Sequence, residues 1–273
     1  MEYEIKPKEK FSLGLAELWQ YRELFYFFTW RDIKVKYKQT TLGFAWAILQ
    51  PLLMMIIFTA VFGKTFKDPE LIGVPYEVFA FSGLILWNIF SSGLTSAGNS
   101  MVSNANIIKK IYFPRLIIPV SAVLVSLFDF LMAFAVFIGL LIYYHIDINI
   151  SRAIIFLPLS LLITTVATFG IGSLLAALNI KYRDFRYIIP FMVQALLFIT
   201  PVIYPISIIS NPVLKYVVAA NPMYSAIALF RSALFDKPLQ LDLILISITS
   251  AVLSFVIGIY YFRRTEAYFA DLA

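Results

Sequence analysis

The sequence contains no cysteine and a single histidine, His145. Without cysteine the chain has no disulfide framework, and one histidine leaves the usual zinc and haem ligand sets unavailable. Charged residues are also scarce, at 14% of the chain, against about 25% in soluble proteins. Hydrophobic residues instead make up 61% of the 273 residues. This composition predicts a membrane protein with little sequence left for a separate soluble domain.

The few charges are mostly basic, and the formal net charge is +6. In a soluble chain this excess would suggest a nucleic-acid partner. Here the basic residues sit at the ends of apolar segments, where orientation in a bilayer accounts for them. We therefore expect no nucleic-acid partner. The first forty residues mix glutamates with lysines and lack a compact apolar core, so no cleaved signal peptide is expected either.

Six apolar stretches are long enough to cross a hydrocarbon core of ~30 Å at ~1.5 Å per helical residue. They predict an all-α membrane domain over residues 42–262, preceded by residues 1–41 and followed by a short tail, 263–273. The expected spans are 42–62, 78–98, 117–144, 154–179, 187–204 and 241–262.

Basic residues predict the orientation of these spans. Most of the 22 lysines and arginines fall before residue 39, in the second loop with Lys109 and Lys110, in the fourth loop with Arg183, and in the tail. The positive-inside rule makes that face cytoplasmic. An even number of spans then places both termini in the cytoplasm.

Residues 11–30 can form an amphipathic helix. The apolar face would carry Leu15, Leu18, Trp19, Phe25 and Tyr26, with Glu17 and Gln20 opposite. Such a helix suits the membrane interface. A soluble helix packed on a partner is the alternative.

The segment 205–240 is too apolar for a solvated loop, yet Pro205, Pro212, Pro222 and Pro238 interrupt it. Each apolar piece is too short to span a bilayer. Two short helices dipping into the outer leaflet satisfy both facts, because helical backbone groups are bonded internally at that depth.

Ionisable groups within the spans are almost absent, which argues against a membrane enzyme that needs several converging polar side chains. Asp129 is the one acid deep in an expected span. A buried acid must face the bundle interior, and it could serve as a proton relay, as a packing or assembly contact, or as a hydrogen-bonded structural acid. We therefore do not expect such an enzyme.

The tripeptide Gly63-Lys64-Thr65 matches the end of a nucleotide-binding P-loop. That loop also needs a glycine five residues before the Gly-Lys pair, where this chain has Phe58. ATP is therefore not bound through this motif, and the energy for transport must come from elsewhere.

Gln50 and Pro51 place a polar residue and a helix breaker inside the first expected span. Proline frees a backbone carbonyl and kinks a helix, which membrane proteins tolerate where neighbours or water bond the freed group. The pair suits the wall of a water-filled conduit, and a plain structural kink is the alternative. Pro201 and Pro205 break the outer end of the fifth span in a similar way.

Four sequence pieces in order resemble the membrane subunit of ABC transporters that export cell-surface polysaccharides, a family that includes O-antigen, capsule and teichoic-acid permeases. The resemblance covers about residues 11 to 262. The pieces are Arg31-Asp32-Ile33 with Lys36-Tyr37-Lys38, Leu42-Gly43, Trp46 and Pro51; Ile111-Tyr112-Phe113-Pro114; the run 179–187; and the run 200–205.

The resemblance implies a permease of ABC-exporter fold in the bacterial inner membrane that works as a homodimer with two cytoplasmic ATPase subunits. ATP and Mg²⁺ would bind to those partners, and no cofactor to this chain. It also implies a coupling helix after the second span, within residues 106–114, and re-entrant gate helices within 205–240. The coupling residues would be Ile107, Ile108, Lys109, Lys110, Ile111, Tyr112, Phe113 and Pro114, and the gate residues Asn211, Pro212, Asn221, Pro222, Tyr224 and Arg231.

Aromatic residues make up 17% of the chain and are spread through the expected spans. Aromatic faces stack on sugar rings, although an interface belt and core packing would also explain them. Aromatic residues and the residues at the two proline breaks together form the expected conduit lining: Phe44, Trp46, Gln50, Pro51, Phe58, Phe198, Pro201 and Tyr204.

The leading functional hypothesis is export of lipid-linked O-antigen-type polysaccharide. A teichoic-acid or capsule permease is the nearest alternative. A drug exporter, a membrane-bound glycan-modifying enzyme and a secondary carrier are further ones.

Overall fold

The computed structural model describes residues 15–38, 43–66, 72–266 and 269, and the expectations for the other residues lie outside this range. The described residues form helices and no strand, which confirms the predicted all-helical class. The elements are α1 Leu15–Gln20, α2 Arg22–Lys38, α3 Ala45–Phe62, α5 Tyr76–Ser103, α6 Ala105–Ile108, α7 Ile117–Tyr143, α8 Ile150–Lys181, α9 Phe185–Ile199, the 3₁₀ turn η1 Ile206–Ile208, α10 Pro212–Ala219, α11 Met223–Phe235 and α12 Leu241–Glu266.

Five of these helices, α3, α5, α7, α8 and α12, are long and apolar enough to cross a membrane. A sixth crossing is counted only if α10 and α11, which are bent by 95° at a short break, form one span. The expected fifth span, 187–204, differs from the structure. Its helix α9 has 15 residues and reaches only about 22 Å at ~1.5 Å per residue.

The early end of α9 has a local cause. Pro201 cannot continue a helix, because its ring removes a backbone donor and disfavours helical geometry at the residue before it. Thr200 is accordingly extended, with ψ 136°. The chain then runs through residues 200–205 without helix and enters η1.

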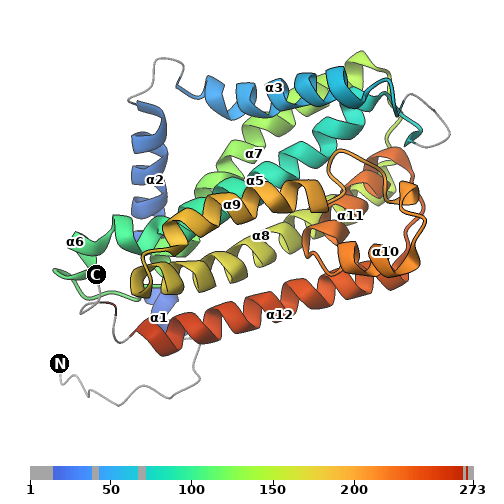
Figure 1. Cartoon of the computed structure of the whole chain (residues 1–273). Helices are drawn as coiled ribbons and strands as arrows, with labels where there is room; N and C mark the ends of the chain where they lie inside the picture. The colour runs from blue at the N-terminus through green and yellow to red at the C-terminus, as the bar shows by residue number, and fades with distance from the viewer. Residues whose placement is uncertain (1–14, 39–42, 67–71, 267–268, 270–273) are drawn as a thin grey trace.

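The long helices run roughly alongside one another between two ends of the molecule (Figure 1). One end, called the α6 end, holds α1, α6, the α8–α9 connection and the last turn of α12. The other, called the α11 end, holds α10, α11 and the last turn of α3. At the α6 end the side-chain Oε1 of Glu266 accepts from the backbone N of Arg115 at 3.1 Å, so α12 is tied to the start of α7.

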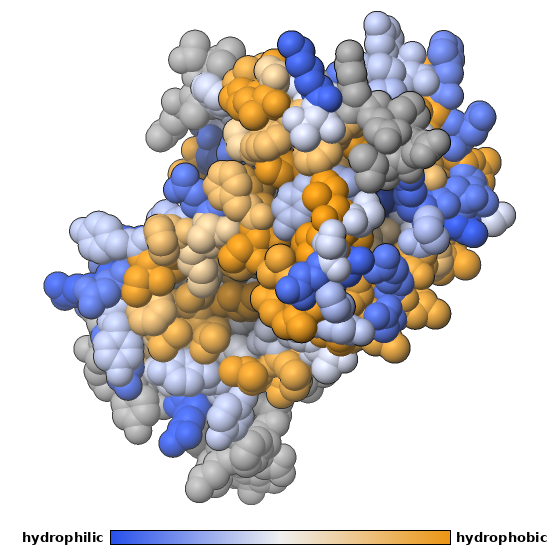
Figure 2. Space-filling model, turned by 45° about the vertical axis from the view of Figure 1, so that its right-hand side comes forward, coloured by the Kyte–Doolittle hydropathy of each residue, from blue (hydrophilic) through white to orange (hydrophobic). Residues whose placement is uncertain are grey.

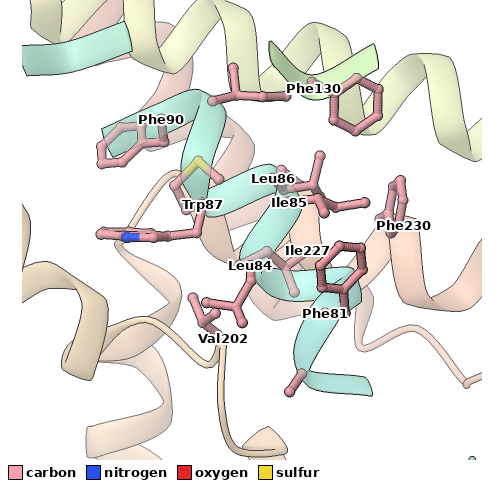
Figure 3. Packing of buried hydrophobic residues seen from close by; sticks show 14 of the residues in the cluster. Phe81, Leu84, Ile85, Leu86, Trp87, Phe90, Phe130, Val202, Ile227 and Phe230 are labelled. Carbon is pink, nitrogen blue, oxygen red and sulfur yellow. The ribbon is translucent and has the colours of Figure 1, made fainter. Parts of the chain in front are cut away.

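Helix α5 lies at the centre and packs against α3, α7, α8, α9 and α11. Its apolar side chains point toward Phe130 of α7, toward Ile227 and Phe230 of α11, and toward Val202 (Figure 3). On the surface, hydrophobic residues form a broad area across the middle of one face, with hydrophilic residues toward its left and upper right margins (Figure 2). This distribution is typical of a bundle surrounded by lipid.

Small residues let α8 and α12 approach closely. A Cβ atom on Gly258 would lie 1.9 Å from the backbone O of Gly170, nearer than any real Cβ contact. Glycine pairs of this kind allow backbones to touch between membrane helices.

The expected amphipathic helix over 11–30 is broken at Tyr21 and continues to Lys38 as α2. Leu18 and Phe25 are half-buried against an apolar cluster at the α6 end, whereas Trp19 and Tyr26 are 69% and 63% exposed. The expected apolar face is therefore divided between the protein core and the surface. Helix α2 itself packs on α7 and runs across the direction of the long helices (Figure 1).

Candidate functional site

The segment expected to meet an ATPase lies at the α6 end. It begins with the single helical turn of α6 and continues as an irregular turn to Pro114. Ile111 and Tyr112 are 62% and 70% exposed. Burial separates the eight expected residues: Lys109, Lys110, Ile111 and Tyr112 are exposed, Ile107 is half-buried, and Ile108, Phe113 and Pro114 are buried. We call the four exposed residues the coupling turn.

Side chains of α2 pack against the residues next to the coupling turn. The ring of Phe113 lies 5.5 Å from the ring of Phe28, in an apolar cluster that also contains Ile108. Nearby, Arg31 Nη2 donates to Asn104 Oδ1 at 2.8 Å and so fixes the residue that joins α5 to α6. A movement of the coupling turn would therefore be transmitted to both α2 and α5.

Asp129 of α7 is buried, with 2% of its surface exposed, but it has partners. Lys36 Nζ and the Tyr37 hydroxyl, both on α2, donate to its two carboxylate oxygens. Burial and the hydrogen bond to Asp129 raise the pKa of the Tyr37 hydroxyl, which keeps it protonated as a donor. Among the roles considered for Asp129, this geometry fits the hydrogen-bonded structural acid, and it joins α2 to the middle of α7.

The segment 205–240 contains the bent pair α10–α11 at the α11 end (Figure 1). Asparagines begin each helix: Asn211 Oδ1 accepts from Val213 N, and Asn221 Oδ1 accepts from Met223 N, each at 2.9 Å. Asn221 Nδ2 also donates to Thr200 Oγ1 at 2.6 Å. Proline follows each asparagine, at positions 212 and 222, where a missing backbone donor costs nothing.

The two helices of this pair are buried to different extents. Most side chains of α10 are exposed and apolar, including Val213 at 68% and Val217 at 58%. Helix α11, by contrast, is buried along almost its whole length, and Tyr224 in its first turn is only 3% exposed. An exposed apolar helix beside a buried one suits a pair that enters a bilayer and turns back.

Arg231 of α11 is buried and joins three elements. Its Nη1 donates to the Pro201 carbonyl at 2.8 Å and its Nη2 to the Val202 carbonyl at 2.6 Å. Nη2 also donates to the Phe79 carbonyl of α5 at 3.1 Å, and the guanidinium lies 3.6 Å from the centre of the Phe79 ring. We call this arrangement the Arg231 clamp. It satisfies the carbonyls that the broken end of α9 leaves without helical partners.

The eight residues expected to line a conduit do not share one surface. Gln50 of α3 is exposed, Tyr204 is half-buried, and its hydroxyl donates to the Ile199 carbonyl at 2.8 Å. Pro51, Phe58 and Pro201 are buried within the chain, and their role in a conduit stays a prediction. The aromatic side chains Phe44, Trp46 and Phe198 are exposed at 51%, 47% and 57%.

Sequence reasoning missed a polar face on α5. Its half-buried and exposed positions are polar with the single exception of Val102. Spacings of three and four residues place them on one side of a helix, and this periodicity is legible in the sequence. The members, which we call the α5 polar stripe, are Asn88, Ser91, Ser92, Thr95, Ser96, Asn99 and Ser103.

Comparison with known proteins gives one family and several relatives. The family model described as ABC-2 type transporter matches residues 23–235. An O-antigen export system permease protein of Klebsiella pneumoniae is 28% identical over 266 residues, which cover 97% of this chain and 98% of that protein. A Myxococcus xanthus protein of the same name is 27% identical over 227 residues, covering 82% and 85%. A polysialic acid transport protein of Escherichia coli is 26% identical over 212 residues, covering 74% and 78%.

Proposed function

Because the chain belongs to the ABC-2 type transporter membrane family, we propose that it is the permease subunit of an ATP-driven exporter of lipid-linked O-antigen-type polysaccharide. Similarity along nearly the whole chain to O-antigen export permeases supports this substrate class. Capsule polysaccharide is the second candidate, favoured by the similarity to polysialic acid transport proteins.

One geometric observation carries the proposal. The exposed coupling turn and the bent α10–α11 pair lie at opposite ends of the long helices (Figure 1). A transporter driven from the cytoplasm needs a contact for the ATPase on one side of the membrane and a closure on the other. The coupling turn supplies the contact for the ATPase, and the α10–α11 pair supplies the closure.

The coupling turn has the chemistry of a docking element. Lys109 and Lys110 offer two positive charges, and Ile111 and Tyr112 offer apolar surface beside them. Such a surface fits an apolar groove with an acidic rim on a partner protein. That partner is a cytoplasmic ATPase that binds ATP and Mg²⁺. The α6 end then faces the cytoplasm, in agreement with the basic residues near it.

Two copies of the chain form the conduit. A sugar hydroxyl stripped of water without a partner costs about 1–3 kcal/mol by mutational estimates, so a glycan needs a continuous wet path. The interior of one copy is filled with apolar side chains around α5 (Figure 3). The path therefore lies between two copies, with α10 and α11 closing its outer mouth.

Deletion and co-purification test the proposal together. In bacteria that carry the gene, deletion should trap a lipid-linked glycan inside the cell, and the tagged chain should co-purify with an ATPase. Chemical analysis of the trapped glycan separates O-antigen from capsule polymer. Normal surface glycan in the deletion strain would refute the proposed function.

A charge reversal tests the coupling turn. Lys109→Glu with Lys110→Glu should sharply reduce the amount of ATPase recovered with the permease, while yield and monodispersity stay at the parent level. The matched control is Lys64→Glu with Lys215→Glu, which reverses two charges nearer the opposite end. Equal ATPase recovery from both variants would refute the assignment of the coupling turn.

A further inference from the structure

The α5 polar stripe inverts the usual pattern of a membrane helix. Along α5 the large apolar side chains, such as Phe81, Leu86 and Phe90, are buried, whereas the stripe lies on the least buried face, with Ser96 and Ser103 exposed and its other members half-buried. Figure 3 shows the apolar side with its neighbours. A helix that faced lipid would turn its apolar residues outward. The open face of α5 is therefore built for something other than lipid.

The stripe lies on a helix that has a neighbouring helix on each side, as the wall of a conduit would. Helix α5 packs against both α3 and α9 and lies between them in Figure 1. These helices contribute the exposed aromatic residues Trp46 and Phe198. Hydrogen-bonding groups on α5 and exposed aromatic side chains on its two neighbouring helices are the two kinds of group that bind and stack on sugar rings.

Three hydroxyl groups of the stripe, those of Ser91, Ser92 and Thr95, donate to backbone carbonyls of α5 itself. Ser92 Oγ donates to the Asn88 carbonyl at 2.7 Å, and Thr95 Oγ1 donates to the Ser91 carbonyl at 2.8 Å. Each hydroxyl oxygen keeps lone pairs that can accept a further bond. The hydroxyl oxygens of the stripe can therefore accept hydrogen bonds from a bound molecule without any rearrangement of the helix.

We propose that the α5 polar stripe is a binding track for the hydroxyl groups of a glycan, with the oxygens of Ser92, Thr95 and Ser96 as acceptors. This inference rests on the proposed function and names the part of the conduit that touches the substrate. Each helical turn repeats the acceptors after ~5.4 Å. A polymer can then exchange one weak bond for the next as it advances and is not held at any single position.

Two other environments would also cover this face, namely lipid and a tightly packed second copy. The absence of cysteine allows a water-filled track to be distinguished from both of these by single cysteines. Ser92→Cys and Ser96→Cys are nearly isosteric changes on the stripe. Thr249→Cys and Val252→Cys are their counterparts on the exposed face of α12.

The probe is the membrane-impermeant reagent 2-sulfonatoethyl methanethiosulfonate, applied to membranes that contain the permease–ATPase complex during ATP hydrolysis. Turnover ensures that a conduit closed at rest is also sampled. Stripe cysteines should react at least about tenfold faster than the α12 cysteines, because an apolar environment raises the thiol pKa and each unit removes about nine tenths of the thiolate. Reaction as slow as that at Val252→Cys would overturn the proposal, whether lipid or a second copy covers the stripe.

Removal of the acceptors tests the contact with glycan. The triple variant Ser92→Ala, Thr95→Val and Ser96→Ala keeps side-chain bulk and should lower the glycan export rate severalfold, with unchanged ATPase recovery. The control Thr249→Val with Ser254→Ala on α12 should export at the parent rate. If the triple variant exported glycan at the parent rate, the binding track would be refuted and the proposed function would stand. Failure of the parent chain itself to export glycan would instead refute the proposed function.

Discussion

Helices α5 and α12 are both long enough to span a membrane, yet they distribute polar and apolar residues in opposite ways. Along the middle of α12 the exposed side chains are mostly large and apolar, including Leu245, Val252 and Val256. The middle of its inward face carries the small residues Ser247, Ala251 and Gly258, and larger apolar residues are buried toward its two ends. On α5 the large apolar residues point inward and the polar ones outward.

The difference teaches what each helix faces. In lipid an exposed hydroxyl gains nothing, while an inward hydroxyl can bond a neighbouring helix, so α12 has the pattern of a lipid-facing helix. The reverse pattern on α5 is the one expected where water or a polar ligand lies outside the helix. Hydropathy alone would class both helices as ordinary spans, because it averages over all faces.

The largest effect is expected where the inward face of α5 meets the Arg231 clamp. Arg231→Met keeps an unbranched apolar stem but removes the guanidinium, and with it the donors to the carbonyls of Pro201, Val202 and Phe79. The Phe79 carbonyl keeps the Ser82 hydroxyl as a donor, whereas the buried carbonyls of Pro201 and Val202 lose the arginine, at about 1–3 kcal/mol for each buried group left unpaired. Thermal unfolding of the purified permease should therefore occur at a clearly lower temperature, with loss of glycan export.

Arg152→Met is the matched control for the clamp. Arg152 pairs with Asp236 at the surface, and both side chains are largely solvent-exposed, so its loss should cost only about 0–1 kcal/mol. The interpretation of Arg231 fails if the two variants unfold at the same temperature.

A smaller loss is expected where α12 touches α8. Gly258→Ala would place a Cβ atom against the Gly170 backbone and force the helices apart, at about 1–3 kcal/mol for overpacking. Gly139→Ala on α7 is the same substitution with nothing within 4 Å of the new atom, and it should stabilise the helix by up to about 1 kcal/mol. Opposite shifts in unfolding temperature are the expected result, and equal shifts would contradict the close packing.

Replacing a serine by alanine should affect stability differently on the two helices, because the hydroxyl points inward on α12 and outward on α5. Ser247 on α12 is fully buried, accepts from Ser225 N at 2.9 Å and donates to the Asn221 carbonyl at 2.8 Å. Ser247→Ala removes the acceptor of the Ser225 N–H, whereas the Asn221 carbonyl keeps the Tyr224 N–H as a donor, and the change should cost about 1–2 kcal/mol. Ser96→Ala on the stripe should leave the unfolding temperature unchanged within error. An equal loss in both variants would show that Ser96 is also an internal contact.

Local sequence signals explain which features could be predicted. Helical class follows from apolar runs, and the expected span 117–144 lies within a residue of α7, Ile117–Tyr143. The apolar character of 205–240, together with the prolines that interrupt it, predicted short helices there. The α5 polar stripe could also have been predicted, because its residues recur every three or four positions. It was missed because the expected conduit lining was chosen from aromatic residues and proline breaks.

Contacts between distant residues explain what could not be predicted. The partners of Asp129 lie more than ninety positions away in the sequence, and no local periodicity indicates them. The Arg231 clamp likewise depends on the fold bringing α11 against the end of α9. The burial of Phe58 and Pro201, both expected to line a conduit, is decided by the same long-range packing.

The smallest effect is expected at Thr249, the exposed hydroxyl in the middle of α12. Its Oγ1 donates to the Leu245 carbonyl of its own helix at 2.7 Å, so it makes no contact that another helix needs. Thr249→Val removes the hydroxyl and keeps the β-branched shape, and it should change stability by no more than about 0.5 kcal/mol. Thr95→Val makes the same chemical change on the stripe, where it should also leave stability intact but slow glycan export. If Thr249→Val slowed export as much as Thr95→Val, the contrast between the two faces would have no functional meaning. If neither variant slowed export, the loss of one acceptor from the track would be compensated by its neighbours, and the triple variant would have to show the effect.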